Sequence, residues 1–167
     1  LVTLRDGSIY RVNLLEKLLV SALARIGSLV PGGGIWMNTQ RPEWNDANNA
    51  LAGYGLSMVT LCYLRRYLHL LSDLLRESAA TSFDVSRELA QLFTGASAVL
   101  KDHATLLDGP VAAAERKSFM DGMGSVNDQF RARIYRGFCG KKEPLEKRDL
   151  QDLTGLALEF VDHSIAH

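Results

Sequence analysis

The sequence contains only two cysteines, Cys62 and Cys139, among 167 residues. This number is too small for a disulfide scaffold, and the wide separation of the two lacks the paired spacing of a zinc site. The four histidines are scattered and show no paired spacing either, so no metal site is predicted. We therefore predict reduced thiols and a cytoplasmic protein, with no cofactor.

The sequence also lacks a surplus of either charge, because 19 Lys and Arg balance 19 Asp and Glu. Nucleic-acid-binding proteins normally show a basic surplus, so no nucleic-acid partner is predicted. The longest strongly apolar stretch, residues 56–75, contains two arginines, a histidine and an aspartate, which is too much charge for a membrane span. Residues 1–10 do not have the order of a signal peptide, and we expect no membrane association.

Strand-like alternation is absent except for a weak pattern in residues 1–10, and there is no internal repeat. Apolar residues instead recur at helical spacing through most of the chain. Helices are predicted in residues 13–27, 56–75, 89–100, 119–134 and 150–161, the last running to the end. Residues 137–144 are predicted to form a loop.

Polar residues and glycines mark the ends and the middle of these helices. Asn13 followed by Glu16 has the form of a capping box, and Asp84 is the predicted cap of the third helix. Gly122 and Gly124 weaken the middle of the fourth helix, which is predicted to be kinked or split. The glycine run at residues 31–34 predicts a flexible break, because it lacks the strand and the Lys-Ser/Thr of a phosphate-binding loop.

The segment 56–75 carries two apolar stripes at helical spacing. One is Leu56, Val59, Tyr63, Tyr67, Leu70 and Leu74, and the other is Leu61, Leu64, Leu68, Leu71 and Leu75. An apolar face of this width predicts that the helix packs on two sides, with both tyrosines in the core. The whole chain, residues 1–167, is predicted to be one all-α domain of helical hairpins, either a bundle or part of a toroid.

A polar and aromatic motif precedes that helix, in residues 41–50. Glu43, Trp44, Asn45 and Asp46 follow one another directly. Indoles suit the apolar face of a sugar ring, and amides and carboxylates suit its hydroxyls. The segment therefore predicts a site for an oligosaccharide or glycoside. The preceding loop adds two candidate substrate-binding residues, Trp36 and Arg41.

The run Glu43-Trp44-Asn45-Asp46, behind a glycine run and ahead of an apolar helix, resembles the acid-bearing loop of (α/α)6-barrel carbohydrate enzymes. The resemblance is greatest to the cellobiose-phosphorylase type, whose loop reads Gly-Asp-Trp-Asn-Asp-Gly. It implies that Asp46 is the general acid, that Trp44 forms part of a sugar subsite, and that the chain is a segment of a larger catalytic domain. Glu43 and Ala47 depart from the family pattern, and residues 35–41 separate the glycine run from the motif.

An inverting enzyme needs a protonated carboxyl on the leaving-group side of the scissile bond. For hydrolysis it also needs a second carboxylate about 6.5–9.5 Å away, whereas in a phosphorylase inorganic phosphate attacks instead. Asp46 can fill the first role if burial near Trp44 or repulsion from Glu43 raises its pKa. No second carboxylate is evident, since Asp121 and Asp128 lack a supporting motif. Hydrolysis and phosphorolysis both remain open.

Two simpler interpretations also remain open. Asn45 and Asp46 could cap the following helix, and Trp36 and Trp44 could pack in the core. On that view the chain is a non-catalytic helical interaction or structural module, whose partner is the remainder of a larger chain or a second copy of itself.

Overall fold

The computed structural model describes residues 3–4, 6–38 and 54–166. The chain is mostly helical, as the periodicity predicts. The helices of the described part are α1 (Leu14–Ile26), α3 (Met58–Glu77), α4 (Arg87–Asp102), α5 (Ala113–Ile134) and α6 (Lys147–Ala166), with a short 3-10 helix, η1 (Ala104–Asp108), after α4. None of these helices is long and apolar enough to cross a membrane.

Two small antiparallel sheets join the helices, and the sequence did not predict them. Strand β1 (Ile35–Asn38) pairs with β2 (Tyr54–Ser57), and β3 (Ser82–Ser86) pairs with β4 (Lys142–Glu146). Each strand has only four or five residues, which is too short for a clear alternation of apolar and polar side chains. The prediction of a loop through residues 137–144 is therefore wrong for its last three residues, which pair with β3.

The predicted helix caps are correct in one case and wrong in another. Asn13 caps α1, because its side-chain oxygen accepts a hydrogen bond from the Glu16 amide at 2.8 Å. Asp84 does not cap α4, because it lies within β3 and the hydroxyl of Ser86 accepts the bond from the Leu89 amide. Since β3 runs directly into α4, the N-cap is the last residue of the strand.

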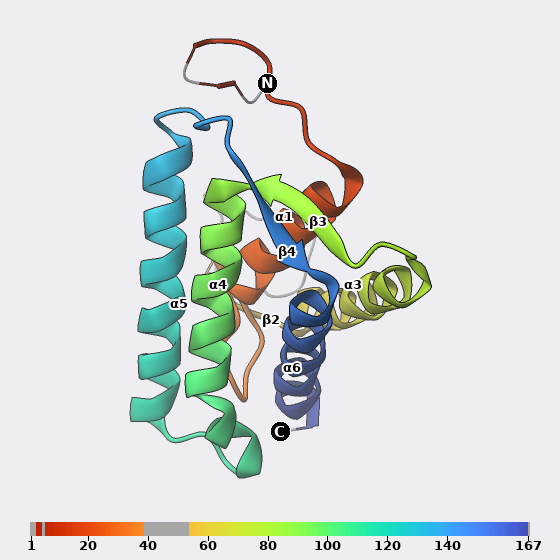
Figure 1. Cartoon of the computed structure of the whole chain (residues 1–167). Coiled ribbons are helices and arrows are strands. Elements are labelled where there is room, and N and C mark those ends of the chain that lie inside the picture. The colour runs from red at the N-terminus through yellow and green to blue at the C-terminus, as the bar shows by residue number, and fades with distance from the viewer. Residues whose placement is uncertain (1–2, 5, 39–53, 167) are drawn as a thin grey trace.

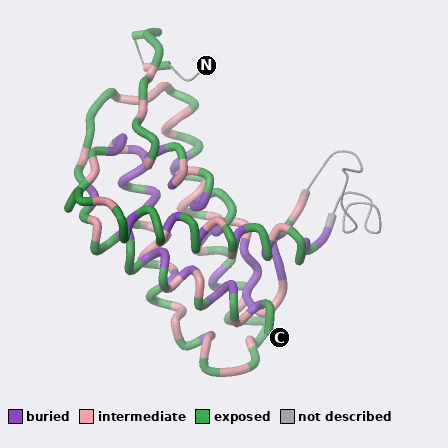
Figure 2. The backbone as a smooth tube through the Cα atoms, turned by 90° about the vertical axis from the view of Figure 1, so that its right-hand side faces the viewer, coloured by how far each residue is buried: buried purple, intermediate pink, exposed green. Residues whose placement is uncertain are grey.

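The helices pack as two pairs joined by α1. Helix α4 packs against α5 and α3 against α6, while α1 contacts both α3 and α4. The β3 and β4 ribbon leads into the N-termini of α4 and α6 and contacts both helices (Figure 1). The helices turn their buried residues inward and leave the outer sides exposed (Figure 2). All helices of the described part therefore share one hydrophobic core.

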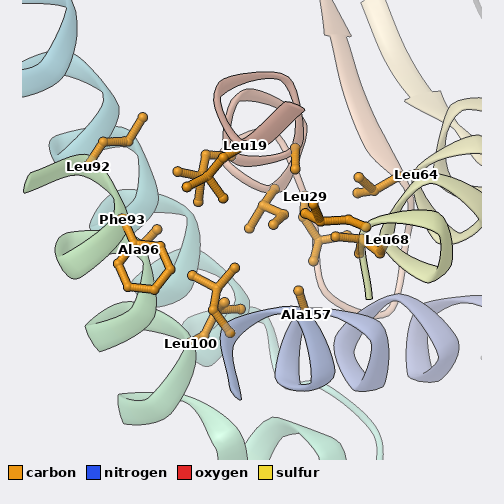
Figure 3. Packing of buried hydrophobic residues seen from close by; sticks show 14 of the residues in the cluster. Leu19, Leu29, Leu64, Leu68, Leu92, Phe93, Ala96, Leu100 and Ala157 are labelled. Atoms are coloured by element: carbon orange, nitrogen blue, oxygen red, sulfur yellow. The ribbon is translucent and has the colours of Figure 1, made fainter. Parts of the chain in front are cut away.

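The centre of this core is aliphatic. Leu19 of α1, Leu68 of α3 and Leu100 of α4 are fully buried and belong to the same cluster as Ala96 and Ala157 (Figure 3). Leu29, from the turn after α1, fills the space beside them. Small residues on α4 and α6 leave room for the larger leucines of α1 and α3 in the interior.

Only one of the two apolar stripes on α3 is buried. Leu61, Leu64, Leu68, Leu71 and Leu75 are all buried in the core. The other stripe is largely exposed, and its exposed members are Leu56, Val59, Tyr63, Leu70 and Leu74. The prediction of packing on both sides is therefore wrong for the described part, and so is the core placement of Tyr63. Tyr67 is half-buried, and its hydroxyl donates to the Leu18 carbonyl at 3.0 Å.

Helix α5 is continuous from Ala113 to Ile134, so the predicted kink is wrong. Its glycine at position 122 faces Val99 of α4, and Gly95 of α4 faces Val126 of α5. A Cβ atom added at Gly95 would lie 2.8 Å from Val126 Cγ1, and one at Gly122 would lie 3.3 Å from Val99 Cγ1. The two Gly–Val pairs thus let α4 and α5 approach closely.

Gly95→Ala is expected to be about 1–3 kcal/mol less stable than Gly124→Ala, because the new methyl group overpacks the α4 and α5 contact. Gly124 is a matched control on α5, since a Cβ there meets nothing within 4 Å and gains the helix propensity of alanine. Urea denaturation of both variants measures the difference. Equal unfolding free energies would contradict the close approach of the two helices.

Candidate functional site

The β1 and β2 pair holds Asn38 and Tyr54, the residues on either side of 39–53, opposite each other. Ile35 pairs with Ser57, and Asn38 pairs with Tyr54, so residues 39–53 connect two hydrogen-bonded strands. The predicted residues Arg41, Glu43, Trp44, Asn45 and Asp46 lie in this connection, outside the described residues. Trp36 is the only candidate substrate-binding residue in the described part.

Trp36 lies on the outer side of the hairpin. Its neighbour Ile35 is fully buried, whereas Trp36 is 45% exposed, as expected for successive residues of a strand. The residue opposite Trp36 is Leu56, which is also exposed. The backbone N–H of Trp36 donates to the Ser28 carbonyl at 2.7 Å, which fixes β1 to the turn after α1. Core packing therefore does not account for Trp36, and a large part of the indole is available to a ligand.

The glycine run before β1 forms a defined turn rather than the predicted flexible break. The Val30 amide donates to the Gly34 carbonyl at 2.9 Å, and the Gly32 amide donates to the Ser164 hydroxyl of α6 at 3.1 Å. The Arg116 guanidinium of α5 donates to the Pro31 carbonyl at 2.9 Å. Two helices thus hold the turn that leads into Trp36.

Close packing explains two of these glycines. A Cβ atom at Gly33 would lie 2.9 Å from Leu56 Cδ1, and one at Gly34 would lie 3.2 Å from the Ser57 carbonyl carbon. The turn therefore packs directly on β2, and side chains there would push the hairpin away from the core. The glycines give the hairpin a rigid base, and they have no role as a phosphate-binding loop in this arrangement.

Helix α3 begins at Met58, and its N-cap is Ser57. The Ser57 hydroxyl accepts a hydrogen bond from the Thr60 amide at 3.1 Å. The alternative in which Asn45 or Asp46 caps this helix is therefore wrong, since β2 supplies the cap.

Other candidates from the sequence have structural partners on the surface. Asp121 pairs with Lys117, and Asp128 pairs with Arg131, along the exposed side of α5. The ring of His103 bonds to the Val99 carbonyl and the Ser118 hydroxyl. Within the part of the chain that the structure describes, no group of three or more His, Cys, Asp or Glu side chains could hold a metal ion. Neither aspartate is therefore a good candidate for the second carboxylate.

The structure adds an ion pair that the sequence pattern did not reveal. Glu16 of α1 is buried, and its carboxylate accepts a hydrogen bond from Lys142 Nζ of β4 at 2.9 Å. The ammonium also lies 4.6 Å from the centre of the Tyr10 ring, which stacks on Phe138. Sequence analysis assigned Glu16 only to a capping box and Lys142 only to a loop. Their separation of 126 residues gave no local signal of the contact.

Folding changes the pKa of Lys142 in a way that favours the ion pair. Burial lowers the pKa of the ammonium, but the interactions with Tyr10 and Glu16 raise it by more, so that the net shift is upward. The contribution of Lys142 to stability is therefore complete at neutral pH and is lost only as the pH rises through the raised pKa. Glu16 borders a cavity of about 380 Å³ whose wall is almost entirely apolar and includes Val20, Leu89 and Phe130.

This cavity is not part of the Trp36 site. It lies along the first half of α1, whereas the glycine turn and β1 follow the C-terminal end of that helix, and none of its lining residues belongs to the turn or to β1. The ion pair ties β4 to α1. Because its carboxylate is already bonded to Lys142, we assign the pair a structural role.

Comparison with protein-family models and with curated proteins finds no match for this chain. The class that the fold defines is a mostly helical protein with two small two-stranded antiparallel sheets. The function is therefore argued from the residues themselves.

Proposed function

We propose that this chain is a carbohydrate-active enzyme, or the segment of one that carries the general acid, and that it acts on a glucosidic linkage with inversion. The proposal assigns Asp46 as the general acid. It assigns Trp36, Arg41, Glu43, Trp44 and Asn45 to substrate binding. The observation that carries it is the half-exposed indole of Trp36 on a rigid strand that leads directly into the acidic motif.

Two features of the hairpin support this proposal. The exposed tryptophan Trp36 is a chemically suitable platform for a neutral sugar, since an indole covers the apolar ring face. Pairing of β1 with β2, together with the turn held by Arg116 and Ser164, fixes the backbone of Asn38 and Tyr54, the two residues that flank residues 39–53. Sites on loops that are anchored by rigid elements are common in enzymes.

In the proposed reaction, Asp46 donates its proton to the glycosidic oxygen as the bond to the anomeric carbon breaks. The nucleophile attacks the opposite face of the sugar and is either water or inorganic phosphate. Water needs a second carboxylate as general base, whereas phosphate does not. Because the paired aspartates of α5 are poor candidates for that base, a phosphorylase remains a full alternative to a hydrolase.

The resemblance to (α/α)6-barrel enzymes extends the proposal to architecture and location. It implies that the helical hairpins form part of a toroid around a central substrate cleft. A cytoplasmic location also belongs to the proposal, and the two cysteines, Cys62 and Cys139, are both free thiols.

Trp36→Ala is expected to weaken the binding of gluco-oligosaccharides about tenfold, because a ring stacked on the indole loses on the order of 60 Å² of apolar contact. Isothermal titration with a series of gluco-oligosaccharides measures the change. Tyr135→Ala is the matched control, since Tyr135 is an exposed aromatic at the end of α5. Equal affinities of Trp36→Ala and the parent protein would remove the observation on which the proposal rests.

A second candidate function is a non-catalytic helical interaction module, and the exposed stripe of α3 favours it. Val59, Tyr63, Leu70 and Leu74 present apolar surface to solvent along the length of that helix. A contiguous apolar stripe of this kind marks an interaction surface more often than it marks a catalytic site. Under this alternative, no gluco-oligosaccharide binds and Asp46 has no catalytic role.

A further inference from the structure

We propose that a second copy of this chain docks on the exposed stripe of α3, so that the protein forms a homodimer with the two α3 helices antiparallel. This inference does not rest on the proposed enzymatic function. The docking surface, called the α3 face below, consists of Val59, Tyr63, Leu70 and Leu74 of α3 with Leu14 of α1.

The α3 face is apolar and largely uncovered. Its five side chains are between 42% and 68% exposed, although four of them are Val or Leu, which are among the residue types most often buried. Leu14 and Leu74 line the same surface hollow of about 320 Å³, which makes α1 and α3 parts of one surface. The core of this chain uses the other stripe of α3 and leaves this one without a packing partner among the described residues.

The size of the α3 face fits a dimer. A standard interface buries about 800 Å² on each partner, and about 65% of a homodimer interface is apolar, which gives about 500 Å² of apolar surface on each side. The exposed parts of the five side chains amount to roughly the same area, on the order of 500 Å², and the largest apolar patch of a protein, about 300–600 Å² on a typical monomer, is often functional.

The spacing along α3 favours a second copy over an unrelated partner. The four exposed residues stand at positions 59, 63, 70 and 74, so the intervals between them are the same when read from either end. A two-fold axis between positions 66 and 67 then places Val59 opposite Leu74 of the second copy, and Tyr63 opposite its Leu70. A self-complementary pattern of this kind is the requirement for a two-fold interface.

The shape of the surface agrees with this arrangement. The hollow of about 320 Å³ lies beside Leu74. In the antiparallel dimer, Val59 of the second copy stands opposite Leu74 and therefore reaches the edge of this hollow. A smaller hollow of about 210 Å³ lies beside Tyr63 and Tyr67, facing Leu70 of the second copy. Each of the two hollows can therefore accept an apolar side chain of the second copy.

Several charged groups near the α3 face have ion-pair partners within the chain. Asp73 and Arg76 form a pair on the same helix, and Arg65 pairs with Asp162 of α6. Arg66 lies near the axis, and its guanidinium is 6.0 Å from the centre of the Tyr63 ring. That stacking keeps the apolar stem of Arg66 along the interface and its charge at the aromatic face.

Sedimentation equilibrium up to about 200 µM is expected to show a species of twice the 18.4 kDa chain mass. Leu70→Glu is expected to weaken dimerisation at least about 100-fold, because the two-fold axis introduces two unpaired charges into one apolar interface. Tyr63→Glu is a second variant with the same expectation in case the first does not fold, and circular dichroism checks the fold of both. Tyr135→Glu, at the exposed end of α5, is expected to remain dimeric.

A disulfide test measures the antiparallel alignment directly. In a Cys62→Ser and Cys139→Ser background, a chain with Tyr63→Cys and Leu70→Cys is expected to oxidise to a covalent dimer. The two new cysteines lie about 10 Å apart within one helix, which is too far for an internal disulfide. Val59→Cys with Leu70→Cys is the mismatched control and is expected to cross-link at most slowly.

A parent protein that stays monomeric at 200 µM would overturn the proposal, and so would a dimer that persists in both glutamate variants. Cross-linking of Tyr63→Cys alone, without a partner cysteine at position 70, would instead indicate parallel helices and would overturn the antiparallel arrangement. None of these results depends on sugar binding, so they test the dimer without testing the proposed enzymatic function.

Discussion

Asp46→Asn is expected to lower the turnover of a glucosidic substrate by about 100- to 10,000-fold, the range that a positioned general acid contributes. Asparagine keeps the size of the side chain but has no proton to transfer to the leaving oxygen. The measurement is the initial rate of product formation by the protein that carries this chain, with water alone and with inorganic phosphate. A rate that requires phosphate would identify a phosphorylase.

The nature of the leaving group separates proton donation from simple loss of binding. A substrate with an acidic leaving group, such as a glycosyl fluoride, needs little protonation as its bond breaks. Asp46→Asn is therefore expected to retain much more of its activity on that substrate than on a disaccharide. Asp102→Asn, on the exposed end of α4, is the matched control and is expected to keep full activity on both. An Asp46→Asn variant with unchanged disaccharide turnover would exclude Asp46 as the acid.

Leu68→Ala is expected to destabilise the protein by about 2–5 kcal/mol, because Leu68 is fully buried and its truncation leaves a cavity beneath α3. Leu70→Ala is the matched control on the same helix, and it is expected to cost about 0.5 kcal/mol or less because Leu70 is half exposed. Both are measured by denaturant unfolding at about 1 µM, where mass action keeps any dimer contribution small.

The comparison of these two leucines tests which stripe of α3 faces the core. Similar losses for both variants at this low concentration would mean that both stripes are buried within one chain. A loss for Leu70→Ala that appears only at high protein concentration would instead agree with the α3 face as a dimer interface.

The helices could be predicted because apolar residues at helical spacing are a strong local signal. The five predicted segments all lie within or overlap the helices of the structure, and Asn13 caps α1 as its sequence context indicates. The choice of buried stripe on α3 could not be predicted, since both stripes consist of large apolar residues. Only the positions of α1 and α6 decide that Leu68 is buried and Leu70 is exposed.

The strands and the glycine contacts depend on residues far away in the sequence. Strands β3 and β4 are separated by more than fifty residues, and the short segment of β4 even contains Pro144. Gly95 and Gly122 depend on distant residues too. They are needed because α4 and α5 approach closely there, and not because of their local backbone conformation. Residue spacing within one segment carries no information about such contacts.

For the candidate site, sequence reasoning found Trp36 but could not decide between a core and a surface position. The decisive facts are the burial of Ile35 and the pairing of β1 with β2, both of which require the fold. The alternative cap at Asn45 or Asp46 lies too far upstream for α3, because strand β2 separates the motif from that helix. Ser57 could have been found as a polar residue directly before the apolar helix.

The most direct test of the proposed function is a crystal structure of Asp46→Asn with a bound gluco-oligosaccharide. We expect the side chain at position 46 within hydrogen-bonding distance of a glycosidic oxygen, about 3 Å, with an indole of Trp36 or Trp44 against a sugar ring. A sugar that binds away from both tryptophans and from position 46 would contradict the account, as would a crystal in which saturating sugar leaves the site empty.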